Sequence, residues 1–95
     1  MSLRVCLHCP LNTQKTSELM QFLKDNLPAV RSFEGCLGVD VYFSLNKEEM
    51  LLEEQWETKE YHQRYIDFIA NNGVLGKLRA YLLEDPDIKY FEKVL

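Results

Sequence analysis

Residues 36–57 read CLGVDVYFSLNKEEMLLEEQWE, and this stretch decides the fold class. Apolar side chains recur at every second position from Leu37 to Leu45, and again at Met50, Leu52 and Trp56, with Glu54 as the exception in the second run. A period of two is that of a β-strand, and the polar residues 46–48 between the two runs predict a turn. We therefore expect an antiparallel hairpin with strands at about 36–45 and 49–57.

Each strand of this hairpin should present two different faces, because side chains alternate across a strand. One face of the strand at 36–45 would carry Leu37, Val39, Val41, Phe43 and Leu45. One face of the strand at 49–57 would carry Met50, Leu52, Glu54 and Trp56.

The chain before the hairpin predicts one strand and one helix. Residues 3–9 alternate in the same way, with one face formed by Leu3, Val5, Leu7 and Cys9. Pro10 cannot continue a strand ladder, and Asn12 or Thr13 can cap the helix that follows. That helix has an apolar stripe formed by Leu19, Phe22, Leu23, Leu27 and Val30. Pro28 is expected to kink or interrupt the helix, and Gly35 to end it.

The chain after the hairpin predicts two helices and a last strand. Thr58 is a suitable N-cap for a helix whose apolar stripe is formed by Tyr61, Tyr65, Phe68 and Ile69. The run Asn71-Asn72-Gly73 ends this helix, and a short third helix lies between Leu75 and Leu82, before Pro86. Residues 88–94 alternate again and predict the final strand.

These elements follow the order β-α-β-β-α-α-β, which predicts an α+β, ferredoxin-like fold over a single domain of residues 1–95. Its antiparallel sheet would have helices on one face only. The strands nevertheless carry apolar side chains on both faces, and Leu37, Val39, Val41 and Phe43 cannot all face water. The simplest solution is a homodimer in which two sheets pack face to face.

The composition excludes several classes of protein. A net charge of -4 and a sequence pI of about 5.1, without a Lys/Arg cluster, argue against nucleic-acid binding. No apolar run approaches the ~20 residues that a membrane span requires. Arg4, His8 and Pro10 interrupt any apolar signal core near the N-terminus. We therefore expect a cytoplasmic protein that binds neither nucleic acid nor membrane.

Three cysteines, an odd number, fit a reducing compartment better than a disulfide framework. Cys6 and Cys9 have the CxxC spacing of metal and redox sites. On a strand, however, these two side chains would point in opposite directions, and no second CxxC completes a metal site. We therefore interpret the cysteines as buried structural thiols and expect no bound metal.

Two short motifs resemble one known family. Glu34-Gly35-Cys36-Leu37-Gly38 is similar to the "pGclgf" entry into the second strand of antibiotic biosynthesis monooxygenase domains. Glu54-Gln55-Trp56-Glu57-Thr58 is similar to the "E-x-W-E-S/T" junction between third strand and second helix in that family. The motifs lie about twenty residues apart, as in the family, and the order of elements matches over nearly the whole chain.

The resemblance implies a dimeric α/β barrel with a pocket between sheet and helices in each subunit. Some members of the family oxidise aromatic phenols or quinols with O₂, without metal or flavin; others degrade haem, and others process a signalling sugar phosphate without oxidation. The resemblance thus suggests a cofactor-free monooxygenase acting on a small phenol or quinol. The alternatives are a non-oxidative small-molecule-binding or isomerase member, or a non-catalytic dimeric sensing module.

The resemblance also implies three catalytic residues. Trp56 matches a tryptophan that shapes the pocket of some phenol oxygenases. His62 falls where those enzymes place a pocket tyrosine, and its ordinary pKa near ~6.5 suits it to deprotonate a phenol. Tyr65 falls where many members have a histidine. In this interpretation a base such as His62 forms the phenolate, which then reacts with O₂.

The remaining candidates are substrate-binding residues: His8, Tyr42, Leu52, Glu54, Phe68 and Arg79. Leu52 replaces an asparagine of the phenol oxygenases, so an expected hydrogen-bond donor is missing. Glu54 lies on the predicted face of Trp56, and His8 could line the pocket or meet a partner subunit. The helical histidine that binds haem iron has no counterpart between Asn72 and Leu78, which argues against haem degradation.

Overall fold

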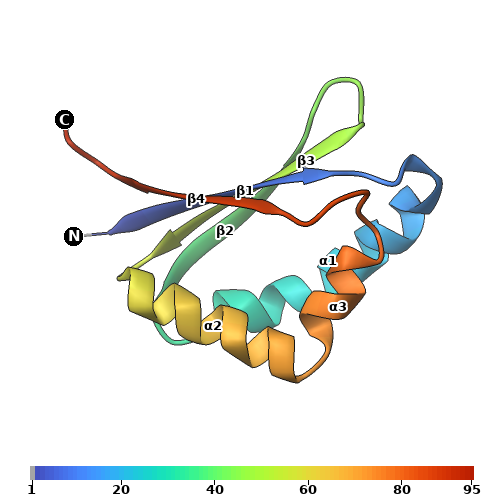
Figure 1. The fold of residues 1–95 in the computed structure, drawn as a ribbon. Coiled ribbons are helices and arrows are strands. Elements are labelled where there is room, and N and C mark those ends of the chain that lie inside the picture. Colours follow the sequence, from blue (N-terminus) through green and yellow to red (C-terminus); the bar gives the residue numbers. More distant parts are fainter. Residues whose placement is uncertain (1) are drawn as a thin grey trace.

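The computed structural model describes residues 2–95. Its elements in chain order are β1 (Leu3–Pro10), a 3-10 helix (Thr13–Lys15), α1 (Thr16–Arg31), β2 (Cys36–Phe43), β3 (Glu49–Trp56), α2 (Lys59–Asn71), α3 (Val74–Arg79) and β4 (Asp87–Glu92). The strands form one antiparallel sheet in the order β2-β3-β1-β4. All three α-helices lie against the same face of this sheet (Figure 1). The predicted α+β, ferredoxin-like fold is confirmed.

Local sequence explains where the helices begin. The side chain of Asn12 accepts a hydrogen bond from the backbone N–H of Gln14 and so caps the 3-10 helix that leads into α1. Thr58 is the N-cap of α2, as predicted, since its Oγ1 accepts the backbone N–H of Tyr61 at 3.2 Å. Each cap satisfies a donor that the first turn of a helix leaves without a backbone partner.

The core lies between the sheet and the helices. Every second residue is buried there in β3 and, from Val5 onward, in β1, and four of these side chains are 0% exposed: Val5, Cys9, Met50 and Trp56. The face of β3 predicted to carry Met50, Leu52, Glu54 and Trp56 is therefore confirmed as the helix-facing side. From α1, Leu19, Leu23 and Val30 complete this layer.

The faces of β2 correct the argument from which a dimer was predicted. Val39 pairs with Glu54 and Val41 with Leu52, so both valines lie on the helix-facing side and not on the opposite one. The register shifts between Cys36 and Gly38, because a β-bulge leaves Leu37 out of the ladder, 53% exposed. The apolar set of β2 is thus mostly part of the core of this single chain.

Several predicted boundaries also change, two of them in α1 and β2. The helix interruption expected at Pro28 is wrong, since α1 continues three residues further to Arg31. Burial of Val30 against the core stabilises this last turn although Pro28 donates no backbone hydrogen bond. The strand expected to reach Leu45 ends at Phe43, because the turn begins at Ser44, whose N–H donates to the carbonyl of Glu49 at 2.8 Å.

Across the described residues 2–95, none of the helices is both long enough and apolar enough to cross a membrane.

Candidate active site

A buried carboxyl group lies at the centre of the sheet. Glu54 is on β3, between Val5 of β1 and Val39 of β2, and only 4% of it is exposed. Two residues further along the same face, the indole Nε1–H of Trp56 donates to Glu54 Oε1 at 2.9 Å. Because side chains at i and i+2 share a face of a strand, this pair follows directly from the local motif.

Burial changes the pKa of this carboxyl group. Transfer out of water disfavours the charged form and raises the pKa of Glu54 from 4.5 to about 6, while the Trp56 hydrogen bond acts in the opposite direction. A carboxyl group with this pKa can bind and release a proton near neutral pH.

His62, on α2, lies next to Glu54. The side chain is 0% exposed, and its Nε2 is 3.6 Å from Glu54 Oε1. Its Nδ1 lies 2.9 Å from the hydroxyl oxygen of Tyr90 on β4. Burial lowers the pKa of His62 from 6.5 to about 4, so the ring is neutral at neutral pH.

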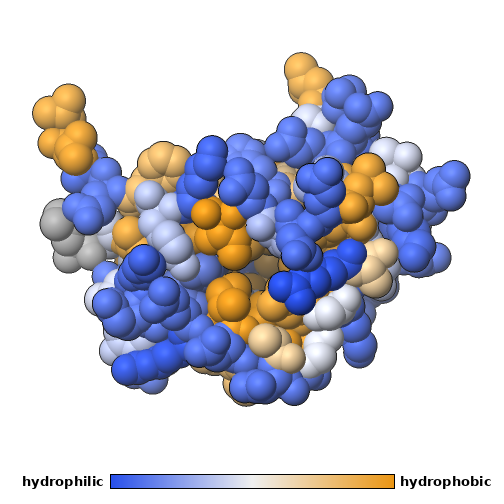
Figure 2. Space-filling model, in the orientation of Figure 1, coloured by the Kyte–Doolittle hydropathy of each residue, from blue (hydrophilic) through white to orange (hydrophobic). Residues whose placement is uncertain are grey.

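An apolar cavity of about 50 Å³ lies beside Glu54, between the sheet and the three α-helices. Among the described residues that line it, only Asn26 of α1, Glu54 of β3 and Tyr65 of α2 are polar. Hydrophobic side chains also gather in a hollow between the sheet and α2 on the surface of the molecule (Figure 2). The ring of Tyr65 packs against the rings of Trp56 and Phe33, with centroid distances of 5.4 Å and 5.2 Å. These two contacts hold Tyr65 beside the cavity.

The structure brings five of the predicted site residues together. Leu52, Glu54 and Tyr65 line the cavity, and Trp56 holds Glu54 by its indole N–H. His62 lies next to Glu54 but is not among the residues that line the cavity. The pKa of Tyr65 is raised, first by burial and then by the nearby charge of Glu54. Its phenol is therefore protonated at neutral pH and able to donate a hydrogen bond.

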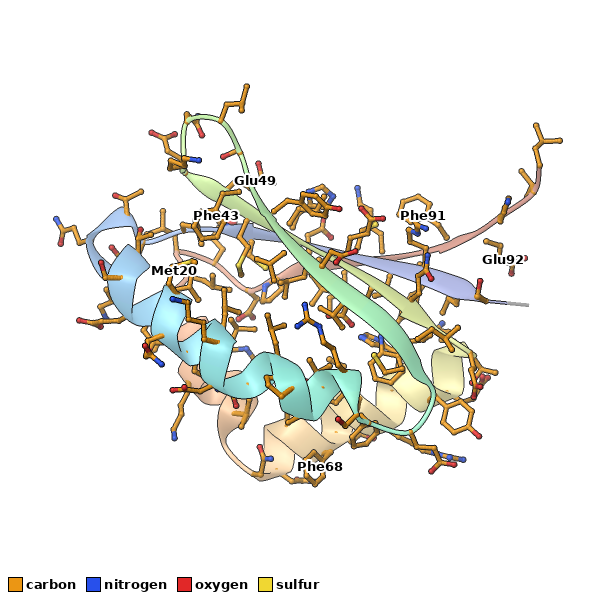
Figure 3. The ribbon with its side chains drawn as sticks, turned by 180° about the vertical axis from the view of Figure 1, so that it is seen from behind. Met20, Phe43, Glu49, Phe68, Phe91 and Glu92 are labelled. Carbon is orange, nitrogen blue, oxygen red and sulfur yellow. The ribbon has the colours of Figure 1, made fainter. Side chains whose placement is uncertain are left out.

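The other four predicted residues lie away from the cavity. His8 is on the sheet face opposite the helices, where its Nδ1 lies 3.2 Å from Oε1 of Glu49. Tyr42 is on that same face and 51% exposed. Arg79 forms an ion pair with Asp85, with 3.1 Å between Nε and Oδ1. Phe68 is 54% exposed and points away from the sheet on the outer side of α2 (Figure 3).

Two residues at the site were not among the sequence predictions. Asn26 belongs to the same helix as the predicted stripe, but as a polar residue it was not assigned to the inner face. Tyr90 reaches His62 from a strand 28 positions away, and no local pattern links the two. The i, i+4 spacing of Asn26 from Phe22 and its position beside Leu27 are the signal that could have revealed Asn26.

No cluster of three or more His, Cys, Asp or Glu side chains that could hold a metal ion occurs within residues 2–95. Cys6 and Cys9 lie on opposite faces of β1, as their spacing predicted, since Cys9 pairs with Met50 and Cys6 with Glu53. Burial raises the pKa of Cys9 to about 12, so this thiol remains protonated and unreactive.

Known structures share this fold over nearly their whole length. A conserved protein from Methanosarcina mazei is 21% identical with a TM-score of 0.88, over 99% of this chain and 94% of that one. Rv0793 from Mycobacterium tuberculosis is 15% identical with a TM-score of 0.84, over 99% and 96% of the two chains. An antibiotic biosynthesis monooxygenase is 12% identical with a TM-score of 0.86, over 98% and 99%. At these identities the likeness shows the fold alone.

The sequence comparisons are more specific. The chain has no significant match among curated protein sequences. The model of the family described as "Antibiotic biosynthesis monooxygenase" matches residues 11–67, which is more than half of the chain. The matched region contains both motifs, the buried carboxyl group and most of the cavity wall. The chain therefore belongs to the antibiotic biosynthesis monooxygenase family.

Proposed function

We propose that this protein, a single domain over residues 1–95, is a cofactor-independent monooxygenase that oxidises a small phenol or quinol with O₂. The observation that carries the proposal is Glu54, a 4% exposed carboxyl group with its pKa raised to about 6, beside an apolar cavity. Deprotonation of an electron-rich phenol is the step such a reaction requires from the protein. A buried base close to its own pKa can perform that step at neutral pH.

In the proposed reaction, ionised Glu54 removes a proton from the bound phenol or from its activated carbon. The carbanion-like anion transfers electrons to O₂ and forms a carbon–oxygen bond, giving a peroxide that recovers the proton from Glu54. Loss of water then leaves one oxygen atom of O₂ in the oxidised product and the other in water. The apolar walls exclude bulk water, and the protein supplies positioning and proton transfer.

In this proposal Glu54 replaces His62 as the base. Glu54 lines the cavity, whereas His62 is fully buried behind it and has its pKa lowered to about 4. Tyr65 and Asn26 would orient the substrate from the opposite side. Asn26 supplies an amide group to a cavity in which Leu52 replaces the asparagine expected from the family resemblance. One N–H of this amide donates to the Phe22 carbonyl at 2.8 Å, and its other polar atoms are available for a ligand.

The route into the cavity would pass between α1 and α3. Three side chains, those of Phe22, Asn26 and Val74, line both the cavity and a surface groove next to it. The cavity volume of about 50 Å³ is well below the ~150 Å³ of an engineered cavity that holds benzene. An aromatic substrate therefore requires these three side chains to move as it binds.

The small volume favours one alternative, a non-oxidative isomerase for a small hydroxyketone. The same carboxyl group could remove the proton next to a carbonyl group and return it to the neighbouring carbon. Such a substrate would need less space than an aromatic ring. Its reaction would proceed without oxygen, which separates it from the first proposal.

We also propose that the protein is a cytoplasmic homodimer. Within residues 2–95, no helix or strand covers the sheet face opposite the helices, which presents three half-exposed side chains, those of Leu37, Tyr42 and Phe91. Phe91 points away from the helices on this side (Figure 3). Burial of large apolar side chains by a second copy would stabilise such a face. The three cysteines are free thiols, in keeping with a reducing compartment.

Oxygen uptake with a panel of phenols, quinols and anthrone-like compounds tests the proposal. The expected result is O₂ consumption above the rate of spontaneous oxidation, with one ¹⁸O atom from ¹⁸O₂ in the product. Glu54→Gln should lower this rate by about 10²–10⁴-fold, the usual contribution of a general base. Turnover of a hydroxyketone without O₂ would replace the proposal by the isomerase, and binding without any turnover would leave a sensing module.

A further inference from the structure

His62 is held at one ring nitrogen only. Its Nδ1 lies 2.9 Å from the Tyr90 hydroxyl oxygen, which is a normal hydrogen-bond distance. Its Nε2 is fully buried and has no hydrogen-bond partner among the described residues, although Glu54 Oε1 is only 3.6 Å away. A buried polar atom aimed at a carboxyl group without a bond to it requires an explanation.

The protonation of the two ring nitrogens is coupled. A neutral imidazole carries one N–H, so one nitrogen donates and the other accepts. If the Tyr90 O–H donates to Nδ1, the proton is on Nε2 and points at Glu54. If Nδ1 donates to Tyr90 instead, the lone pair of Nε2 faces the lone pairs of the carboxylate. Ionised Glu54 therefore favours the tautomer with Nε2–H, and Tyr90 supports the same tautomer as a donor.

Lys59 strengthens Tyr90 as a donor. Its ammonium nitrogen lies 5.0 Å from the centre of the Tyr90 ring, within the range of a cation–π contact. A cation above the ring withdraws electron density from the phenol and makes its O–H a better donor.

We propose that Tyr90 is a positioning residue that holds His62 in the Nε2–H tautomer and thereby stabilises the ionised form of Glu54. This inference rests on the proposed function for its catalytic meaning, but its structural content does not depend on a substrate. Ionised Glu54 would draw the Nε2–H closer, so that Oε1 accepts from both Trp56 and His62. The second carboxyl oxygen is then left to accept a proton from the cavity.

Few other charged groups influence the protonation of Glu54. The titratable groups that face it from the surrounding elements are the thiols of Cys9 on β1 and Cys36 on β2, and the phenols of Tyr65 on α2 and Tyr90 on β4. The pKa of each is raised, first by burial, so all four are neutral at neutral pH. Arg31 of α1 donates to the Val39 carbonyl at 2.9 Å, and Lys59 lies on the Tyr90 ring. The hydrogen bond from Trp56, together with the one proposed from His62, is thus the main local means of stabilising the carboxylate.

Tyr90→Phe tests the inference because it removes one hydroxyl group and keeps the ring. In the full-length protein, ¹⁵N NMR reports the tautomer of His62, and ¹³C NMR of the carboxyl carbon reports the titration midpoint of Glu54. We expect the Nε2–H form in the wild type at neutral pH and a mixture of tautomers in Tyr90→Phe. The Glu54 midpoint should rise by about one pH unit.

Two further variants make the outcome specific. Tyr81→Phe removes a phenol that packs on Phe22, away from Glu54, and should change neither signal. In a His62→Phe background, where the ring has no hydrogen-bonding atom, the route from Tyr90 to Glu54 is broken, so Tyr90→Phe should no longer shift the Glu54 midpoint. The inference is overturned if the wild type holds the Nδ1–H tautomer. It is equally overturned if Tyr90→Phe shifts the midpoint equally with and without His62.

The same variant separates this inference from the proposed function. If a substrate of the monooxygenase is found, the acidic limb of its pH–rate profile should move to higher pH by about the same one unit in Tyr90→Phe. If no substrate consumes O₂ but the NMR results are as expected, the proposed function fails and the positioning role of Tyr90 stands.

Discussion

The indole N–H of Trp56 donates to Oε1 of Glu54 at 2.9 Å, from the same face of one strand, and both side chains are almost completely buried. A buried carboxyl group is costly unless its oxygens have partners. Here one oxygen is held by Trp56, while the group as a whole also borders an apolar cavity. The E-x-W motif is therefore a unit that places a proton-binding group at the cavity wall.

Glu54 should make stability depend on pH. Because its pKa is raised from 4.5 to about 6, the folded protein binds this proton more tightly than the unfolded chain does. Ionisation of the carboxyl group therefore lowers the free energy of unfolding as the pH rises from 4.5 through 6. Above this pH range the total loss is about 2 kcal/mol. Glu54→Gln lacks this effect. Its free energy of unfolding, relative to that of the wild type, should therefore rise by about 2 kcal/mol as the pH increases from about 4 to about 7.

Urea unfolding at a series of pH values measures this difference. Glu57→Gln, at an exposed side chain three residues further on, is the matched control and should follow the wild-type curve. A difference between Glu54→Gln and wild type that is constant over this pH range would contradict the burial of an ionisable Glu54.

Gly35 should be irreplaceable at the entry to β2. Its φ is +87°, which side chains other than glycine rarely adopt, and an added Cβ would lie 2.3 Å from Cγ of Tyr61. Gly35→Ala should therefore lower the free energy of unfolding by about 2–4 kcal/mol, from backbone strain and overpacking together. Gly73 has the same φ of +87° but no atom within 4 Å of the added Cβ, so Gly73→Ala should cost only about 1 kcal/mol. Equal losses in the two variants, by chemical denaturation, would disprove the close contact with Tyr61.

The proposed dimer should depend on the sheet face opposite the helices. Phe91→Asp places a charge on that face, and we expect it to weaken association by at least about tenfold, seen as monomer by sedimentation velocity at micromolar concentration. Phe68→Asp is a matched control, because Phe68 is 54% exposed and Phe91 50%, but Phe68 lies on the helix side. Loss of the dimer in Phe68→Asp instead, or a monomeric wild type, would rule out pairing through this face.

The cavity should accept aromatic ligands more readily when its wall is shortened. Phe22→Ala opens the wall shared with the surface groove and brings the volume toward the ~150 Å³ that accommodates benzene. We expect phenol to bind about tenfold more tightly, at a cost of about 1–3 kcal/mol in stability. Isothermal calorimetry with phenol measures the affinity. Met20 lines a neighbouring groove between α1 and β2 but not the cavity, so Met20→Ala should leave the affinity unchanged, and an equal gain there would show that phenol binds elsewhere.

The order of elements and most strand faces could be predicted from the sequence, because they depend on local backbone geometry. Alternation at a period of two placed Met50, Leu52, Glu54 and Trp56 on one face, and Thr58 marked the start of α2. The extra residue at Leu37 could not be read in this way, since a bulge changes the register with β3 and leaves the alternating pattern intact. For this reason Leu37 was wrongly placed on the face of Val39, Val41 and Phe43, which do share one face.

The sequence by itself determined the family, the fold class and the presence of Glu54 and Trp56 on one buried face. Only the tertiary structure decided that Glu54 borders the cavity while His62 lies behind it, and that Tyr90 reaches His62. It also brought Asn26 into the cavity wall. The physical reason is that strand and helix periods fix which side chains share a face, within one element. Which faces meet, and at what distance, depends on how helices from distant parts of the chain pack onto the sheet.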